Sequence, residues 1–186
     1  MVESLINILE TPNPDAYMFR ISEMLIPSGT HEFKRDDPLD DAPLASALLR
    51  IQSIELILIA PNFITVRKTP EAEWHDLTPK VVEALETFLE SGEMAVFERC
   101  GTTSSKNLTE LEQRVLELLN EEVRPAIAMD GGDFIYHGIS EGLVQIELIG
   151  ACGSCPSSTA TLYNGIQNLL MEEFPNLKGV EQIQSA

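Results

Sequence analysis

The sequence has 186 residues and a formal net charge of −18, because 30 Asp and Glu outnumber 12 Lys and Arg. This length allows one ordinary domain or two small ones, and a hydrophobic content of 44% excludes wholesale disorder. Nucleic acids and anionic membranes are bound through clustered Lys and Arg, so we expect neither as a partner.

Residues 1–92 predict a β-rich α+β domain. The apolar runs on either side of Ala60-Pro61-Asn62 are typical of a hairpin, and Thr78 followed by Pro79 is typical of a helix start. In chain order, the predicted elements are strands over 5–9 and 17–21, a short helix over 46–51, strands over 54–59 and 63–67, and a helix that starts at Thr78 and stops at Gly92.

Residues 107–186 predict a second small domain, which a polar linker over 93–106 separates from the first. Asn107 and Glu110 have the spacing of a helix capping box, and Arg124-Pro125 is expected to end the helix that they begin. The remaining elements are predicted as strands over 134–139 and 143–149, a helix from Pro156 to Pro175, and a short strand over 180–183, which gives the order α-β-β-α-β.

The cysteines are Cys100, Cys152 and Cys155. An odd, small number at uneven spacing does not form a secreted disulfide framework, and three thiols cannot build a four-cysteine metal site within one chain. The first residues also lack the pattern of a signal or transit peptide. We therefore expect a cytoplasmic protein.

Cys152 and Cys155 lie where a predicted strand turns into a helix, with Pro156 suited to the first helical position. Free N–H groups and the positive end of the helix dipole lower the pKa of a thiol at such a place. The thiolate that results is the form that binds metal or attacks a disulfide.

Three interpretations of this pair compete: a structural thiol pair, a thioredoxin-like redox pair, and half of a metal or cluster site. Against the redox pair, no Trp precedes Cys152, Pro156 lies outside the pair, and the order of elements does not resemble β-α-β. A metal or cluster site needs four ligands. The other candidate ligands within the chain are Cys100, His31, His75 and His137. Cys100 lies in the linker, His31 and His75 lie in the first domain, and His137 lies in the middle of a predicted strand. The simpler completion is a second copy of the chain.

Several motifs resemble the NifU/Nfu family. The C-terminal domain of that family is matched by Arg124-Pro125, by Asp130-Gly131-Gly132-Asp133, which we interpret as a turn that requires positive φ, and by the run from Gly150 to Thr159. Its N-terminal domain is matched by Thr11-Pro12-Asn13-Pro14, by Asn62 to Val66 and by Trp74. One departure is Tyr163, where relatives commonly have Lys.

The resemblance implies an α+β protein with a β-rich Nfu N-terminal domain and a NifU-like C-terminal domain, and a function as an iron–sulfur cluster scaffold or carrier. It implies that Cys152 and Cys155 of two protomers hold a [4Fe–4S] cluster, so that cluster binding produces a homodimer. An upstream assembly scaffold would supply the cluster, and apo iron–sulfur client proteins would receive it. No enzymatic activity is expected. A thiol–disulfide oxidoreductase and a zinc-stabilised interaction module are the alternatives.

Overall fold

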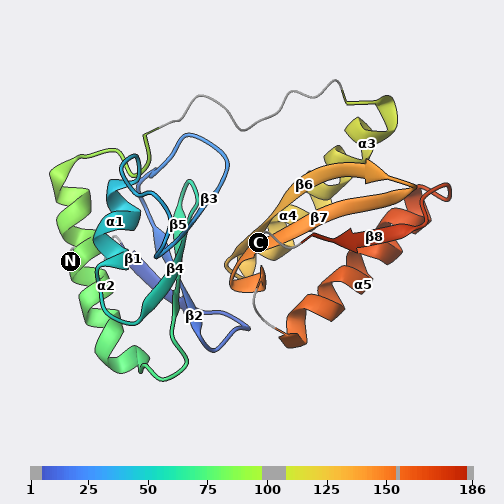
Figure 1. Ribbon diagram of the computed structural model, residues 1–186. Coiled ribbons are helices and arrows are strands. Elements are labelled where there is room, and N and C mark those ends of the chain that lie inside the picture. The colour runs from blue at the N-terminus through green and yellow to red at the C-terminus, as the bar shows by residue number, and fades with distance from the viewer. Residues whose placement is uncertain (1–5, 98–107, 154–155, 184–186) are drawn as a thin grey trace. The chain divides into compact units, whose positions relative to one another are not determined.

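The computed structural model describes residues 6–97, 108–153 and 156–183, and it divides at residues 102 and 103 into two units (Figure 1). We call residues 1–102 the first unit and residues 103–186 the second unit, and each is described by itself. Cys100, Asn107, Cys155 and most of the predicted linker lie outside the described residues. Within the described ranges, no helix is long and apolar enough to cross a membrane.

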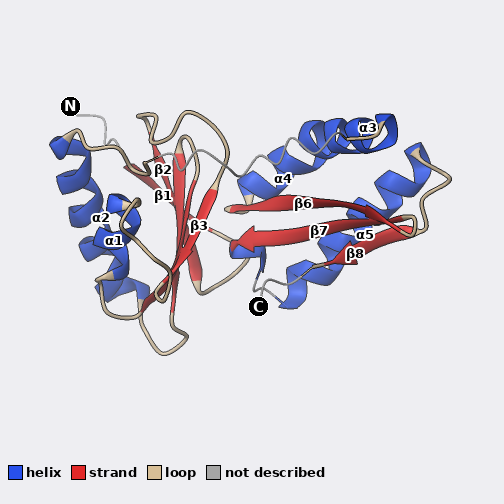
Figure 2. Cartoon of the chain, turned by 45° about the horizontal axis from the view of Figure 1, so that its top comes forward, coloured by secondary structure: helices blue, strands red, loops and turns tan. Residues whose placement is uncertain are grey.

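The first unit contains a five-stranded sheet in which every neighbouring pair is antiparallel, in the order β1-β2-β5-β4-β3. Two helices lie on one side of it (Figures 1 and 2). The strands are β1 (Ile6–Glu10), β2 (Ala16–Ile21), β3 (His31–Lys34), β4 (Ile54–Ile59) and β5 (Phe63–Lys68), and the helices are α1 (Pro43–Leu49) and α2 (Trp74–Ser91).

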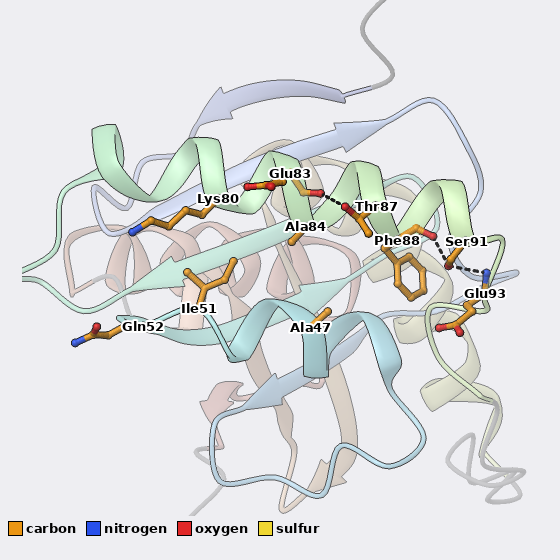
Figure 3. Close-up of a pocket in the computed structure, with 10 residues that line it drawn as sticks. All are labelled: Ala47, Ile51, Gln52, Lys80, Glu83, Ala84, Thr87, Phe88, Ser91 and Glu93. Carbon is orange, nitrogen blue, oxygen red and sulfur yellow. Dashed lines mark hydrogen bonds between the residues drawn. The ribbon is translucent and has the colours of Figure 1, made fainter.

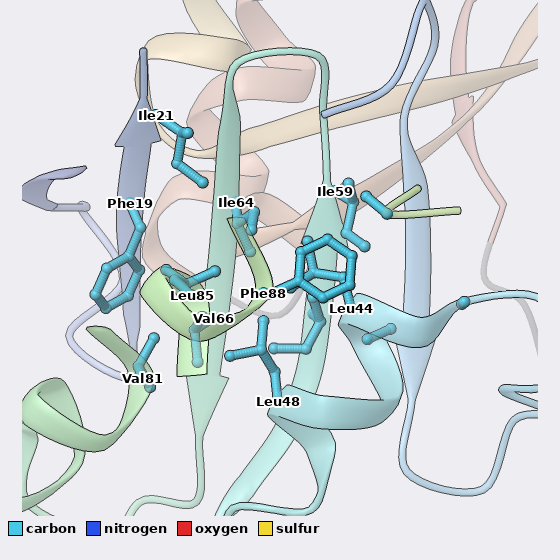
Figure 4. Packing of buried hydrophobic residues seen from close by; sticks show 14 of the residues in the cluster. Phe19, Ile21, Leu44, Leu48, Ile59, Ile64, Val66, Val81, Leu85 and Phe88 are labelled. Atoms are coloured by element: carbon cyan, nitrogen blue, oxygen red, sulfur yellow. The ribbon is translucent and has the colours of Figure 1, made fainter. Parts of the chain in front are cut away.

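Alternate residues of the sheet and one face of each helix form the core of this unit (Figure 4). The apolar spacing of α2 predicts this face, since residues three and four apart lie together on a helix. Its buried members include Phe19, Ile64 and Val66 from the sheet, Leu44 and Leu48 from α1, and Val81, Leu85 and Phe88 from α2.

The predicted start of α2 is wrong. The helix begins at Trp74, and Pro79 lies inside it. Trp74 stacks on Tyr17 with ring centroids 4.1 Å apart, and its Nε1 donates to the Pro14 carbonyl oxygen at 3.0 Å. These contacts with the strand layer stabilise an extra helical turn that local sequence does not reveal. The predicted stop is confirmed, because Gly92 caps the helix with a φ of 66°.

Two further details of the first unit differ from the prediction. Strand β3 is missed, because His31–Lys34 lacks apolar alternation; it is a half-exposed edge strand that pairs with β4. Helix α1 begins at Pro43 rather than at Ser46, since proline suits the first turn of a helix.

The second unit has the predicted α-β-β-α-β order. Its sheet has the order β6-β7-β8, with β6 and β7 antiparallel and β7 and β8 parallel. The elements are α3 (Glu110–Leu118), a π-helical segment (Leu119–Val123), α4 (Arg124–Met129), β6 (Gly132–Ser140), β7 (Leu143–Gly150), a 3₁₀ turn (Ala151–Gly153), α5 (Pro156–Glu173) and β8 (Gly179–Gln182).

The helices of the second unit pack on the sheet residues that alternate toward them. The buried cluster contains Val115, Leu119, Val123 and Ile127 from the first helical stretch, Phe134, Val144, Ile146 and Leu148 from the sheet, and Ile166 and Leu170 from α5. This packing holds β7 along its length, and the 3₁₀ turn that contains Cys152 comes directly after β7 in the chain.

Both predicted boundaries of the first helix in this unit are wrong. The capping box is formed by Thr109 and Glu112, two residues after the predicted one. Arg124-Pro125 does not end the helix, because a π-helical turn precedes it in which the Arg124 N–H donates to the Leu119 carbonyl. Pro125 then falls in the first turn of α4, the part of a helix in which proline is best tolerated.

Candidate functional site

The structure describes one of the two predicted ligands. Cys152 lies in the 3₁₀ turn between β7 and α5, and it is 4% exposed. Its side chain belongs to the hydrophobic cluster of the second unit. Cys155 lies outside the described residues, and α5 begins immediately after it at Pro156.

Gly132 packs directly against the cysteine turn. A Cβ atom at this position would lie 2.7 Å from the Cys152 Sγ and 3.0 Å from the Ile149 carbonyl oxygen. Gly132 pairs with Gly150 across the first register position of β6 and β7, so the two backbones are fixed there. The site therefore requires glycine at 132 for space.

The positive φ that the sequence predicts for the turn over residues 130–133 belongs to Gly131, the residue before Gly132. Gly131 has a φ of 75°, which confirms the turn interpretation for that position. Its carbonyl oxygen accepts a hydrogen bond of 3.2 Å from the Ala151 N–H. The turn that opens β6 is thus tied to the turn that carries Cys152.

An ion pair between a buried carboxylate and a partly exposed guanidinium holds the start of β6. The Asp133 side chain is 3% exposed, and its Oδ2 lies 2.6 Å from Arg124 Nη1. Asp133 Oδ1 accepts from the Phe134 N–H at 2.8 Å, and the Arg124 guanidinium lies 4.4 Å from the Phe134 ring centroid. Sequence reasoning missed this pair, although both residues stand in the quoted motifs. It anchors the strand that supports Cys152.

Tyr163 has a structural position on α5. Its hydroxyl donates to the Ile146 carbonyl oxygen of β7 at 3.3 Å. Burial raises the pKa of Tyr163 to about 12. The tyrosine that replaces Lys at this position thus links α5 to the sheet through its hydroxyl.

Of the three histidines, His137 alone belongs to the second unit with Cys152. His137 Nε2 lies 2.9 Å from Glu147 Oε2 across β6 and β7, so its imidazole has a partner within the sheet. His31 and His75 belong to β3 and α2 of the first unit. Over the described part of the chain, no group of three or more His, Cys, Asp or Glu side chains is arranged to hold a metal ion.

The connection around the cysteines corrects one argument from the sequence. Strands β7 and β8 are parallel neighbours, and α5 joins them, so the turn with Cys152 lies in a β-α-β connection. The expectation that the order does not resemble β-α-β is therefore wrong. The prediction failed because the terminal strand is short and its pairing partner is not visible in the sequence.

Comparison with known proteins identifies two family matches. Residues 6–92 match the family described as scaffold protein Nfu/NifU N terminal, and residues 115–181 match the NifU-like domain. The human protein named NFU1 iron-sulfur cluster scaffold homolog, mitochondrial, is 38% identical over 177 residues, which cover 94% of this chain and 70% of that protein. The Drosophila ananassae protein of the same name is 34% identical over 95% of this chain and 63% of its own length.

The expected cytoplasmic location is wrong by this comparison, because both relatives are named mitochondrial. That expectation rested on the first residues of the chain, whereas the relatives extend beyond the matched region. Among solved structures, a NifU-like protein from Saccharomyces cerevisiae has a TM-score of 0.45 and 28% identity, covering 52% of this chain and 88% of its own. A Staphylococcus aureus protein has a TM-score of 0.39 and 25% identity, covering 43% and 96%.

Proposed function

The chain belongs to the Nfu/NifU family of scaffold proteins, and from this premise we propose that it carries an iron–sulfur cluster as its cargo. Cys152 and Cys155 of two protomers bind a [4Fe–4S] cluster between them. An upstream assembly scaffold supplies the cluster, and apo iron–sulfur proteins receive it. The observation that carries the proposal is the family match over both units, together with the position of Cys152 in the turn that precedes α5.

The number of thiolates determines the proposed stoichiometry. A [4Fe–4S] cluster takes four thiolate ligands, and this pair supplies two from each chain. A homodimer therefore forms when the cluster binds. Thiolates of a client can replace those of the scaffold one at a time, since metal–thiolate affinity depends on competing deprotonated ligands. No acid–base step is needed for this exchange.

Anaerobic reconstitution with iron and sulfide tests the proposal. We expect about four irons and four sulfides for every two chains, and a dimer by native mass spectrometry. Cys152→Ser and Cys155→Ser should each lose the bound iron, whereas Cys100→Ser, the matched control, should keep it. Full loading of either Ser variant, or a loaded monomer, contradicts the shared site.

A thiol–disulfide oxidoreductase is the second candidate, because the cysteine turn lies in a β-α-β connection. Such an enzyme reduces insulin disulfides as the apo monomer and has a measurable two-electron potential. We expect the apo protein to show no such activity. Zinc measured in the protein as purified, alongside iron and sulfide, separates the third candidate, a zinc-stabilised module.

The first unit has a separate role in this proposal. Residues 1–92 contain no cysteine, so they provide no thiolate for a cluster. We propose that this unit recognises the proteins that deliver or accept the cargo.

A further inference from the structure

A groove of about 580 Å³ runs between α1 and α2 of the first unit (Figure 3). It is open because both facing positions are alanines, Ala47 on α1 and Ala84 on α2, where larger side chains would close the gap. Ile51 and Phe88 add apolar surface beside them, so the middle of the groove is hydrophobic.

The hydroxyl groups on the α2 side of the groove bond to their own helix. Thr87 Oγ1 donates to the Glu83 carbonyl oxygen at 2.8 Å, and Ser91 Oγ donates to the Phe88 carbonyl oxygen at 2.7 Å (Figure 3). Their protons are therefore not available to a ligand. The polar side chains of the lining that remain are Gln52, Lys80 and the carboxylates of Glu83 and Glu93.

The rim carries two carboxylates, Glu83 in the middle of α2 and Glu93 just after its end. Glu83 and Glu93 are exposed, and among the residues that the structure describes neither takes part in an ion pair. The C-terminal end of α2 beside Glu93 adds the negative pole of the helix dipole. Lys80 is the one cation of the lining, and residues 1–92 have a net charge of 7 − 16 = −9.

Apolar surface continues along the chain past this acidic end. Met94 is 55% exposed and Phe97 is 47% exposed, directly after Glu93. The Phe97 N–H donates to the Asp41 carbonyl oxygen at 2.8 Å, which holds this segment beside the loop before α1. Exposed large apolar side chains next to a hydrophobic groove are typical of a protein interaction site.

We propose that this groove binds an amphipathic helix of a partner protein, with apolar side chains against Ala47 and Ala84 and with Lys or Arg facing Glu83 and Glu93. Two helices border the groove, so it suits a helix laid between them with anchors at positions i, i+4 and i+7. The lining of α2 extends from Lys80 to Ser91, about 16 Å, which three helical turns span.

The identity of the helix donor rests on the proposed function, since the partner would be a protein that gives or receives the cluster. The binding itself does not depend on Cys152. The experiment therefore measures helix binding and cluster loading separately on the full chain.

The probe is a synthetic peptide of about 14 residues with Leu on one helical face and Lys or Arg on the other. Its controls are the same composition in scrambled order and a version with Glu in place of each basic residue. We expect saturable binding of the basic amphipathic peptide by fluorescence anisotropy at about 0.15 M salt, and amide shifts confined to α1, α2 and residues 93–97 in NMR spectra.

Two double variants decide whether the groove is responsible. Glu83→Lys with Glu93→Lys should weaken peptide binding by roughly tenfold or more. Glu86→Lys with Glu90→Lys changes the net charge equally on exposed positions of α2 outside the groove, and it should keep the affinity within about twofold. Both variants should load iron normally, whereas Cys152→Ser should bind the peptide normally.

Several results would overturn the proposal. Equal losses in the two double variants would mean that diffuse charge attracts the peptide. Equal binding of the scrambled or acidic peptide would exclude recognition of a basic amphipathic helix. Sedimentation that shows self-association lost only in the groove variant would assign the groove to a second copy of the chain.

Discussion

Replacing Gly132 with Ala tests how closely the start of β6 packs on Cys152. The added methyl would lie 2.7 Å from the Cys152 Sγ and 3.0 Å from the Ile149 carbonyl oxygen, so either the cysteine turn or the β6–β7 pairing must shift. Overpacking of this kind costs about 1–3 kcal/mol. We expect lower stability of the second unit, and incomplete iron loading because the thiol is displaced.

Urea unfolding measures this loss, since tryptophan fluorescence reports the first unit alone and far-UV circular dichroism reports both units. Trp74 is the single tryptophan and lies in the first unit, so its fluorescence should be unchanged by the substitution. A circular dichroism transition that the fluorescence does not follow therefore belongs to the second unit. With a urea m-value of about 1 kcal/mol/M, the transition of that unit should move down by roughly 1–3 M.

Gly165 provides the matched control in the same unit. Apart from the backbone of its own helix and its two chain neighbours, a Cβ there would meet no atom within 4 Å, and Gly165 lies in the middle of α5. Gly165→Ala should therefore stabilise the unit by about 0.5–1 kcal/mol. An unchanged transition and full iron loading in Gly132→Ala would refute the packing argument.

Three other changes have defined outcomes in the second unit. Asp133→Asn removes the buried carboxylate that binds the partly exposed Arg124 guanidinium, and urea unfolding should show a loss of about 1–3 kcal/mol. Thr109→Ala removes the capping box and should cost about 1 kcal/mol in the same assay. Unfolded tyrosine loses its proton at a pKa of 10.0 and folded Tyr163 at about 12, so stability should fall as the pH rises between these values. In Tyr163→Phe, urea midpoints measured over this range should lack that part of the decline.

Apolar pattern was sufficient to predict the elements that are stabilised by their own burial. Strands β4 and β5 appear where alternating and continuous apolar runs predict them, and Gly92 ends α2 because few other residues adopt its positive φ. The start of α2 depends instead on Trp74 meeting Tyr17 and Pro14, which are distant in sequence. The capping box was ambiguous, because Asn107 with Glu110 and Thr109 with Glu112 have the same spacing.

Some features of the candidate site could likewise be predicted from the sequence, and others could not. The spacing of Cys152 and Cys155 before a proline is visible in the sequence, and so is the turn at Gly131. The contact between Arg124 and Asp133 is not, because it depends on a helix that continues through Pro125. Steric demand at Gly132 is equally hidden, since it arises where two strands and a turn meet.

The π-helical segment of the second unit keeps the core side chains of the first helical stretch on one face. The core side chains of this stretch recur every four residues, at Val115, Leu119, Val123 and Ile127. Such a repeat drifts around an ideal α-helix by about 40° at each step. The π-helical segment rotates less for each residue that it adds, so it reverses part of the drift. Arg124 directly follows the π-helical segment, and the direction of its side chain around the helix axis determines whether the guanidinium reaches Asp133. The five residues of π-helix thereby orient the Arg124 side chain, which anchors β6 beside Cys152.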